Sequence, residues 1–275
     1  MLRMLRAGRA AGAARTLLER LSRDRILRRR LPPELGGHTL LVSPDAAMKF
    51  WRSDLRRADP LLLALARELV RPGATVWDLG ANVGLFAAAA AYLAGSSGTV
   101  LAIEADEWLA GLLRQTAHTL PANQAPIEVL SVAVGGALGI ADFHLASRGR
   151  AANHLASVGG STQAGGTRAV KKVVTVTLDW LLGWFPPPQL VKLDVEGAEL
   201  ACLRGASELL ARHRPVLLCE VGDDTAGAVG GLLLAAGYTL FDAAQPRGTR
   251  RPLATPAWNT LALPAALPAV TGEAR

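Results

Sequence analysis

The segment VWDLGANVGLF, residues 76–86, decides the fold of this 275-residue chain. An apolar run typical of a β-strand ends at Asp78, and a turn from Gly80 to Gly84 then opens an apolar helix. Glycine lets the backbone bend sharply and lets a ligand approach without a Cβ in the way. Asn82 is the non-glycine residue best suited to a left-handed conformation. Since the free N–H groups of the helix point at the turn, the segment predicts a strand–turn–helix unit that binds a ligand there.

Two ligand classes use such a turn. A dinucleotide fingerprint, G-x-G-x-x-G, would need glycine at positions 82 and 85, where this chain has Asn82 and Leu85. The pattern D-x-G-x-(G/N)-x-G fits residues 78–84 throughout. This pattern resembles the first motif of class I S-adenosylmethionine-dependent methyltransferases.

An acid follows the next strand-like run. The run TVLAIEAD, residues 99–106, places Glu104 26 residues after Asp78. A carboxylate at this point of a nucleoside-binding α/β fold can accept hydrogen bonds from both ribose hydroxyls. Either acid alone is equally well explained as a solvated residue at a strand end. Both acids together, with the glycine turn between them, favour a nucleoside site.

Strand-like and helical segments alternate along most of the chain, which predicts a mostly parallel sheet covered by helices on both faces. The strand-like runs are residues 74–79, 99–104, 127–134, 190–194, 216–221, 238–242 and 258–263. The helical stretches are residues 60–70, 85–94, 107–119, 198–212 and 225–236. We expect the strand order 3-2-1-4-5-7-6, with strand 7 antiparallel.

The organisation around this core is expected to have three parts. Residues 1–35 predict a basic helical extension, with loosely spaced leucines between arginines up to residue 30. Residues 36–72 predict a strand pair and a helix that lead into the core, and residues 73–275 the main domain. Residues 135–177 are rich in Gly, Ser and Ala and interrupt the alternation. They predict a hairpin and a flexible loop, of the kind that often forms a lid or a substrate wall.

Charged residues gather in a third motif, LVKLDVEGAELACLRGA, residues 190–206. Strand alternation puts Lys192 and Asp194 on one side, while Glu196 and Glu199 follow the strand. Ligands of open α/β sheets lie beyond the carboxyl ends of the strands, so these groups should face the same crevice as the glycine turn. Charged groups at a buried strand are costly unless they pair or bind something. Glu199 is equally well explained as an acid favoured by the start of a helix.

Together these motifs resemble the FkbM-type methyltransferases over residues 60–264. The resembling stretches are VWDLGANVG, VLAIEAD, SVAVGG, VTLDWLL, LVKLDVEGAEL with LRGA, RPVLLCEV and NTLALP. The resemblance implies a class I methyltransferase fold, S-adenosylmethionine as cofactor and methyl transfer to oxygen, commonly of a sugar or polyketide hydroxyl. It implies a cofactor site formed by Asp78, Gly80, Ala81, Asn82, Gly84, Glu104, Ala105 and Ala133. It also places Asp194 where cofactor and acceptor meet.

The acceptor hydroxyl needs activation, because an alcohol is a weak nucleophile at neutral pH. We expect Asp194 or Glu196 to act as general base or to bind a divalent metal ion, and Lys192 is a weaker catalytic candidate. His144 and His154, in the inserted segment, are rival bases, although a lone histidine is more often a packing or surface residue. Trp180 and Trp184 could wall the acceptor site, although packing beside a short helix explains them as well.

Charge and composition limit the partners. Residues 1–30 carry a net charge of +8, whereas residues 31–275 carry −1. The near-neutral body argues against a nucleic-acid-binding face and leaves a small-molecule or glycan acceptor as the expected partner. The basic segment fits contact with an anionic membrane surface or a protein, but equally a frayed extension. Two cysteines, Cys202 and Cys219, no signal-peptide core and no membrane-spanning apolar run predict a cytoplasmic protein.

Two other function classes remain open at this point. One is a nucleotide-sugar or NAD-dependent enzyme on a similar sheet, against which the missing G-x-G-x-x-G fingerprint counts. The other is a non-catalytic scaffold that keeps the fold and is recruited through residues 1–30. The intact turn and acids count against the scaffold, and binding of S-adenosylhomocysteine or of NADH would distinguish the three.

Overall fold

The apolar strand-like runs assemble into one seven-stranded sheet, in a computed structural model that describes residues 18–19, 21–158 and 165–265. The strands are β3 (Thr75–Leu79), β4 (Thr99–Ile103), β5 (Ile127–Leu130), β10 (Leu190–Leu193), β11 (Val216–Glu220), β12 (Tyr238–Asp242) and β13 (Asn259–Pro264). Their spatial order is β5-β4-β3-β10-β11-β13-β12, and β13 runs antiparallel to both of its neighbours. The predicted order 3-2-1-4-5-7-6 is therefore confirmed.

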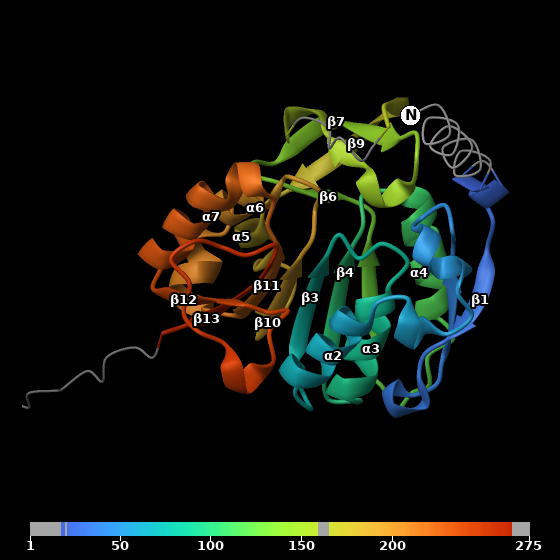
Figure 1. Ribbon diagram of the computed structural model, residues 1–275, viewed down its shortest axis with the longest axis horizontal. Helices are drawn as coiled ribbons and strands as arrows, with labels where there is room; N and C mark the ends of the chain where they lie inside the picture. Colours follow the sequence, from blue (N-terminus) through green and yellow to red (C-terminus); the bar gives the residue numbers. More distant parts are fainter. Residues whose placement is uncertain (1–17, 20, 159–164, 266–275) are drawn as a thin grey trace, which may run out of the picture.

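Helices cover both faces of this sheet (Figure 1). One face carries α2 (Pro60–Leu69), α3 (Leu85–Ala94) and α4 (Glu107–Ala117), and the other carries α5 (Leu178–Leu181), α6 (Glu199–Arg204) and α7 (Asp223–Ala235). The strands supply both cores because successive side chains alternate in direction. On β3, Val76 packs with the first set of helices and Trp77 with the second.

Helix α3 is unusual in being apolar around its whole circumference. The five alanines at positions 87–91 have no accessible surface. A helix that is apolar all round is expected only where it is enclosed, and α3, in contact with α2 and β4, is enclosed except near Tyr92, which is 39% exposed. Since α3 begins directly after Gly84, the enclosed helix also fixes the position of the glycine turn that precedes it.

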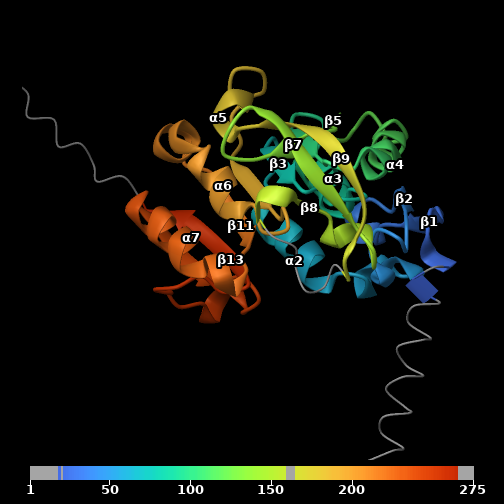
Figure 2. The same cartoon turned by 90° about the horizontal axis from the view of Figure 1, so that it is seen from above.

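The inserted segment forms a second sheet rather than a hairpin with a long flexible loop. Its strands are β6 (Ala133–Val134), β7 (Gly139–Ala146), β8 (His154–Leu155) and β9 (Thr167–Val176), in the order β6-β9-β7-β8. The hairpin itself is confirmed as the antiparallel pair β7–β9. This inserted sheet lies over the carboxyl ends of the parallel strands, and from above β7 and β9 cross the molecule (Figures 1 and 2).

The predicted strand over residues 127–134 is wrong as a single element. It divides into β5, in the central sheet, and β6, in the inserted sheet, with two residues between them. The continuous apolar run hides the division, because both pieces are β-strands and only their partners differ.

The predicted helical extension needs correction where the structure describes it. Residues 27–30 form strand β1 (Leu27–Arg30), which pairs antiparallel with β2 (Thr39–Val42). The hairpin partner of β2 thus lies inside the stretch assigned to the extension, and no strand pair lies within residues 36–54. Pairing prevails over the helical leucine spacing because Leu40 and Val42 of β2 enter the core completely. Residues 1–17 and 20 of the predicted basic helix lie outside the described residues.

The predicted helix over residues 198–212 is interrupted. Helix α6 ends at Gly205, and a π-helical turn, Leu209–His213, follows. A Cβ at position 205 would lie 2.8 Å from the carbonyl oxygen of Gly135, so the chain passes too close to the inserted segment for a side chain there. In the part of the chain that the structure describes, no helix has the length and apolarity that crossing a membrane requires.

Candidate functional site

The turn after β3 has the backbone expected from its residues. Gly80, Asn82 and Gly84 all adopt positive φ angles, of 71°, 54° and 82°. The reason for the glycines differs from the predicted ligand approach. A Cβ on Gly80 would lie 1.7 Å from the carbonyl oxygen of Asp194, and one on Gly84 would lie 2.1 Å from Leu113. The glycines therefore let the turn pack against β10 and α4, and the packing places the turn beside the end of β10.

Glu104 joins this turn to the end of β4. Its carboxylate accepts one hydrogen bond from the Asn82 N–H and one from the Asp106 N–H, each 2.8 Å long. Each oxygen keeps a lone pair for a further donor. Burial raises the pKa of Glu104 to about 7, although both N–H donors act in the opposite direction. The carboxylate is thus oriented by the backbone and lines a cavity.

Lys192 holds the centre of the sheet's carboxyl edge. Its Nζ lies 3.1 Å from Asp78 Oδ1 and 3.4 Å from Asp194 Oδ2, and it donates to the Gly80 carbonyl at 3.1 Å. Burial opposes the ammonium charge, but the two carboxylates outweigh burial and raise the pKa of Lys192. Complete burial raises the pKa of Asp78, a shift that Lys192 counteracts. The prediction that Lys192 and Asp194 share one side of the strand is confirmed.

Asp78 and Gly84 do not reach the cavity that the other motif residues line. Asp78 has no accessible surface and lies beneath Lys192. It therefore supports the turn from below, instead of lining the cofactor site as the resemblance implied. Strand register explains this position, because Asp78 is the partner of Lys192 in the β3–β10 pair.

The loop from β10 to α6 orients two further acids. Glu196 has a φ of +49° and lines the cavity. Glu199 points back into the loop, where its Oε1 accepts hydrogen bonds from the N–H groups of Val195 and Gly197. Glu199 thus lies in the first turn of α6, as its alternative explanation expected, whereas the Glu196 carboxylate has no hydrogen bond or ion pair with the residues that the structure describes. Burial, with the Asp194 charge second, raises the pKa of Glu196 to about 8.

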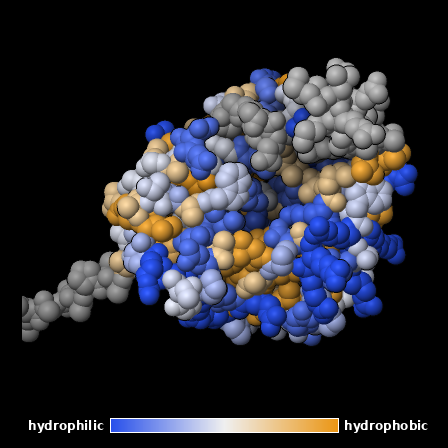
Figure 3. Space-filling view, in the orientation of Figure 1, coloured by the Kyte–Doolittle hydropathy of each residue, from blue (hydrophilic) through white to orange (hydrophobic). Residues whose placement is uncertain are grey.

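These groups surround a cavity of about 310 Å³ between the sheet's carboxyl edge and the inserted sheet. The face of the molecule seen in Figure 3 is hollowed near its centre. One set of lining residues, which the resemblance assigns to the cofactor and which we call the cofactor half, includes Gly80, Ala81, Asn82, Glu104, Ala105 and Ala133. The other half, the acceptor half, includes Lys49, Phe50, Asp59, Glu196, Glu220 and Asn259. Asp194 lines the cavity together with both groups.

Several lining residues were missed from the sequence. Glu220 ends β11, and burial, with Asp194 second, raises its pKa to about 7. Its position at the carboxyl end of a strand could have revealed it. Lys49 forms an ion pair of 2.6 Å with Asp59, and Arg150 and Asn153 enter from the inserted segment. No local sequence pattern marks Lys49, Asp59, Arg150 or Asn153 as a lining residue.

The rival candidates lie outside the cavity. His144 and His154 contact each other edge to face, with ring centroids 5.3 Å apart, and neither lines the cavity. Trp180 and Trp184 pack on each other at 5.7 Å, also away from it. The histidine-base and tryptophan-wall hypotheses are therefore wrong for this cavity.

The prediction of metal ligands stays untested, and both cysteines are buried. No group of three or more His, Cys, Asp or Glu side chains suited to a metal ion occurs within residues 18–19, 21–158 and 165–265. Asp194 and Glu196 as metal ligands therefore stay a prediction. Cys202 and Cys219 are both buried and free, and the Cys202 thiol donates to the Val134 carbonyl.

Three features together define a class of enzyme. They are the antiparallel strand 7 between strands 5 and 6, the glycine turn after strand 1 and the acid after strand 2. The protein is a class I methyltransferase, and its cofactor is S-adenosylmethionine. The family follows from the sequence itself. The model of the methyltransferase FkbM domain matches residues 78–240, and the chain belongs to the FkbM methyltransferase family.

Individual relatives are more distant. The hexuronic acid methyltransferase AglP of Haloferax volcanii is 24% identical over 179 residues, which are 64% of this chain and 68% of AglP. The solved FkbM methyltransferase of Methylobacillus flagellatus KT is 16% identical with a TM-score of 0.41, over 73% of this chain and 49% of that one. This chain thus spans about half the length of that relative. An O-methyltransferase of Thermotoga maritima is 12% identical with a TM-score of 0.39, over 75% of this chain and 66% of that one.

Proposed function

We propose that the protein transfers the methyl group of S-adenosylmethionine to a hydroxyl oxygen of a sugar, a glycan or a polyketide-type small molecule. The observation that carries this proposal is the division of the cavity. Its cofactor half presents a backbone-oriented carboxylate, and its acceptor half presents carboxyl groups without partners among the described residues. The name of the archaeal relative, a hexuronic acid methyltransferase, supports a sugar.

In the cofactor half, Glu104 would accept hydrogen bonds from the two ribose hydroxyls of the cofactor. The residues fit this role, because each Glu104 oxygen already accepts one N–H and still has room for one hydroxyl donor. Ala81, Asn82, Ala105 and Ala133 form the neighbouring wall. The bound cofactor supplies an activated methyl group on a sulfonium, so the protein's own task is to align the acceptor and take its proton.

In the acceptor half, polar groups from separate elements surround the apolar side chain of Phe50. Lys49 is a donor, Asn259 is both donor and acceptor, and Glu196 and Glu220 are acceptors once ionised. A polyhydroxylated acceptor can satisfy such a mixed set in several directions at once, whereas an apolar acceptor would leave it unpaired.

Glu196 is the general base that removes the hydroxyl proton. Asp194, the other candidate, is engaged in an ion pair with Lys192, whereas Glu196 has no such partner among the described residues. Burial raises the pKa of Glu196 to about 8, which is close to the operating range in which a base is most effective. With the cofactor bound, the hydroxyl proton would pass to the Glu196 carboxylate as the acceptor oxygen bonds to the methyl carbon, and the carbon–sulfur bond would break to release S-adenosylhomocysteine.

The cellular setting is part of the same proposal. We infer a cytoplasmic protein whose basic segment, residues 1–30, contacts an anionic membrane surface or a partner protein. Co-sedimentation of the full chain with vesicles of neutral or anionic lipid tests this segment. Binding restricted to the anionic vesicles supports membrane contact, and no binding to either removes it.

The main test combines cofactor binding with an acceptor screen. Calorimetric titration of the full chain with S-adenosylhomocysteine, beside an NADH control, should give binding to the former only. Methyl transfer from labelled S-adenosylmethionine is then measured with neutral glycosides, uronic acid glycosides and polyketide alcohols. Transfer to a hydroxyl, located by fragmentation mass spectrometry, is the expected result. Transfer to a carboxylate or to nitrogen would overturn O-methylation of a hydroxyl, and a folded protein that binds no S-adenosylhomocysteine would overturn the whole proposal.

A further inference from the structure

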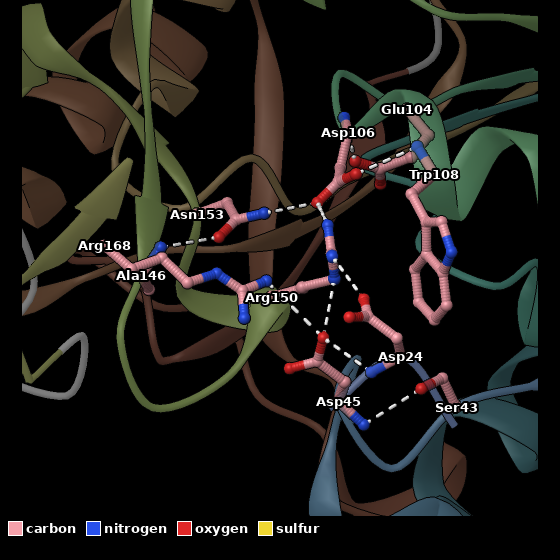
Figure 4. A network of polar contacts seen from close by, with 10 residues as sticks. All are labelled: Asp24, Ser43, Asp45, Glu104, Asp106, Trp108, Ala146, Arg150, Asn153 and Arg168. Carbon is pink, nitrogen blue, oxygen red and sulfur yellow. Dashed lines mark hydrogen bonds and ion pairs between the residues drawn. The ribbon is translucent and has the colours of Figure 1, made fainter. Parts of the chain in front are cut away.

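Arg150 lies buried at the junction of three parts of the chain. It belongs to the turn between β7 and β8, and only 9% of its side chain is accessible. Its guanidinium pairs with three aspartates: Asp106 at the start of α4, and Asp45 and Asp24 from the N-terminal segment (Figure 4). Burying one cation among carboxylates from separate elements is stabilising only when the geometry is held closely. The environment of Arg150 therefore requires a closely held geometry, although Arg150 lies outside the sequence motifs.

The contacts on one side lead directly to Glu104. Arg150 Nη1 lies 2.7 Å from Asp106 Oδ2, which also accepts from Asn153 Nδ2 at 2.8 Å. The backbone N–H of Asp106 in turn donates to Glu104 Oε1. The guanidinium also stacks on the Trp108 ring, 4.5 Å from its centroid. The orientation of the Glu104 carboxylate thus depends on a residue of the inserted segment.

The contacts on the other side hold the N-terminal segment. Arg150 Nε donates to Asp45 Oδ2 at 2.8 Å, and the Arg150 N–H donates to the Asp45 carbonyl at 2.7 Å. The Ala151 N–H donates to the Ala46 carbonyl at 2.9 Å. Arg168 of β9 also reaches Asp45, at 3.4 Å, but has no contact with Asp106. One side chain therefore ties the inserted segment, the N-terminal segment and the β4–α4 turn together.

We propose that Arg150 is a positioning residue for the cofactor. By holding Asp106, it fixes the β4–α4 turn so that Glu104 presents its free lone pairs to the ribose. By holding Asp45, it makes cofactor affinity depend on two segments outside the parallel sheet. This inference rests on the proposed role of Glu104. Coupling is reciprocal, so cofactor binding must in turn stabilise the Arg150 contacts.

The planar fork of arginine is needed for this role. It donates in several fixed directions and stacks on an aromatic ring, whereas the lysine ammonium is a compact charge on a flexible stem. Arg150→Lys keeps the positive charge but loses the fixed hydrogen-bond directions of the guanidinium. The lysine variant therefore separates positioning from simple charge balance.

The test compares Arg150→Lys and Arg150→Gln with the full-length wild type and with Arg168→Gln as a matched control. Arg168→Gln removes a buried arginine contact to Asp45 and leaves Asp106 untouched. We expect both Arg150 variants to raise the Kd for S-adenosylhomocysteine and the KM for S-adenosylmethionine by about 10- to 100-fold, with a much smaller change in kcat. Arg168→Gln should change the Kd by less than about threefold.

Two outcomes overturn the proposal. One is a folded Arg150 variant, with the wild-type circular dichroism spectrum, that binds S-adenosylhomocysteine as the wild type does. The other concerns the wild type alone and applies even if the variants do not fold. Hydrogen exchange in residues 39–45, which do not line the cavity, should slow on binding of S-adenosylhomocysteine, and unchanged exchange contradicts the coupling. A wild type that binds no S-adenosylhomocysteine removes the proposed function itself.

Discussion

The two halves of the cavity use their carboxylates in different ways. In the cofactor half, Glu104 accepts two backbone N–H groups and is linked through Asp106 to Arg150. In the acceptor half, Glu196 and Glu220 have no hydrogen bond or ion pair with other described residues. In the proposed function, the first half is organised before the cofactor arrives, whereas the acceptor completes the second. Pre-organisation suits a ligand that is always the same, and free carboxyl groups suit proton transfer.

The largest effect should come from Lys192, which lies between the two halves. Lys192→Met leaves Asp78 buried without its cation, and we expect the free energy of unfolding to fall by about 3–5 kcal/mol. Denaturant unfolding measures this change. The control is Lys172→Met, which removes an exposed ion pair of similar length with Asp142 and should cost under about 1 kcal/mol. Equal losses in the two variants would mean that burial of the Lys192 pair is unimportant.

A smaller loss of stability should follow from Gly80→Ala in the cofactor half. The new Cβ would meet the Asp194 carbonyl in addition to the cost of a positive φ. Gly37→Ala is the control, because Gly37 also has a positive φ but no atom closer than 3.8 Å to the new Cβ. The control should lose about 1–2 kcal/mol and Gly80→Ala clearly more. Thermal unfolding of both variants tests the packing reason for Gly80, which equal shifts would contradict.

Glu196→Gln tests the acceptor half by activity. Loss of a general base should lower kcat by about 100-fold or more. The Kd for S-adenosylhomocysteine should stay within about twofold, because Glu196 makes no contact with the cofactor half. The control is Glu128→Gln on β5, whose side chain is exposed. A variant that keeps its turnover but loses cofactor affinity would assign Glu196 to the other half.

Stability should also depend on pH. The folded state raises the pKa of Glu196 to about 8 from an ordinary value of 4.5, so it binds more protons than the unfolded state between these pH values. Stability should therefore fall as the pH rises through this range, since the carboxyl must ionise while buried. Glu196→Gln should flatten the slope measured by denaturant unfolding at several pH values. A slope that is unchanged in the variant would assign the pH dependence to other groups.

The sequence predicted the glycine turn and the order of the sheet, because a short contiguous motif and a regular alternation mark them. Gly80, Asn82 and Gly84 lie in one turn, and the strand alternation gives the order of the sheet. The acceptor half and the Arg150 contacts could not be predicted in the same way. Lys49, Arg150 and Asn259 come from unrelated segments, and only the tertiary structure brings them to one cavity.

Some motif residues were identified with an incomplete physical reason. Gly80 was expected to make room for a ligand, and the structure shows that it makes room for the chain at Asp194. Asp78 was expected at the cavity and lies below it. In both cases the neighbour lies on β10 or directly after it, more than a hundred residues along the chain, so a local pattern marks the position but not its contact.

The alanines of α3 have a consequence for how the chain folds. Alanine has the highest helix propensity and no side-chain rotamers to fix, so α3 can form early, on the order of 0.1–1 µs for a short helix. It connects β3 and β4, which pair in parallel directly beside it. We expect this unit to condense first, with the glycine turn already shaped within it. The acceptor half joins distant segments and is assembled last.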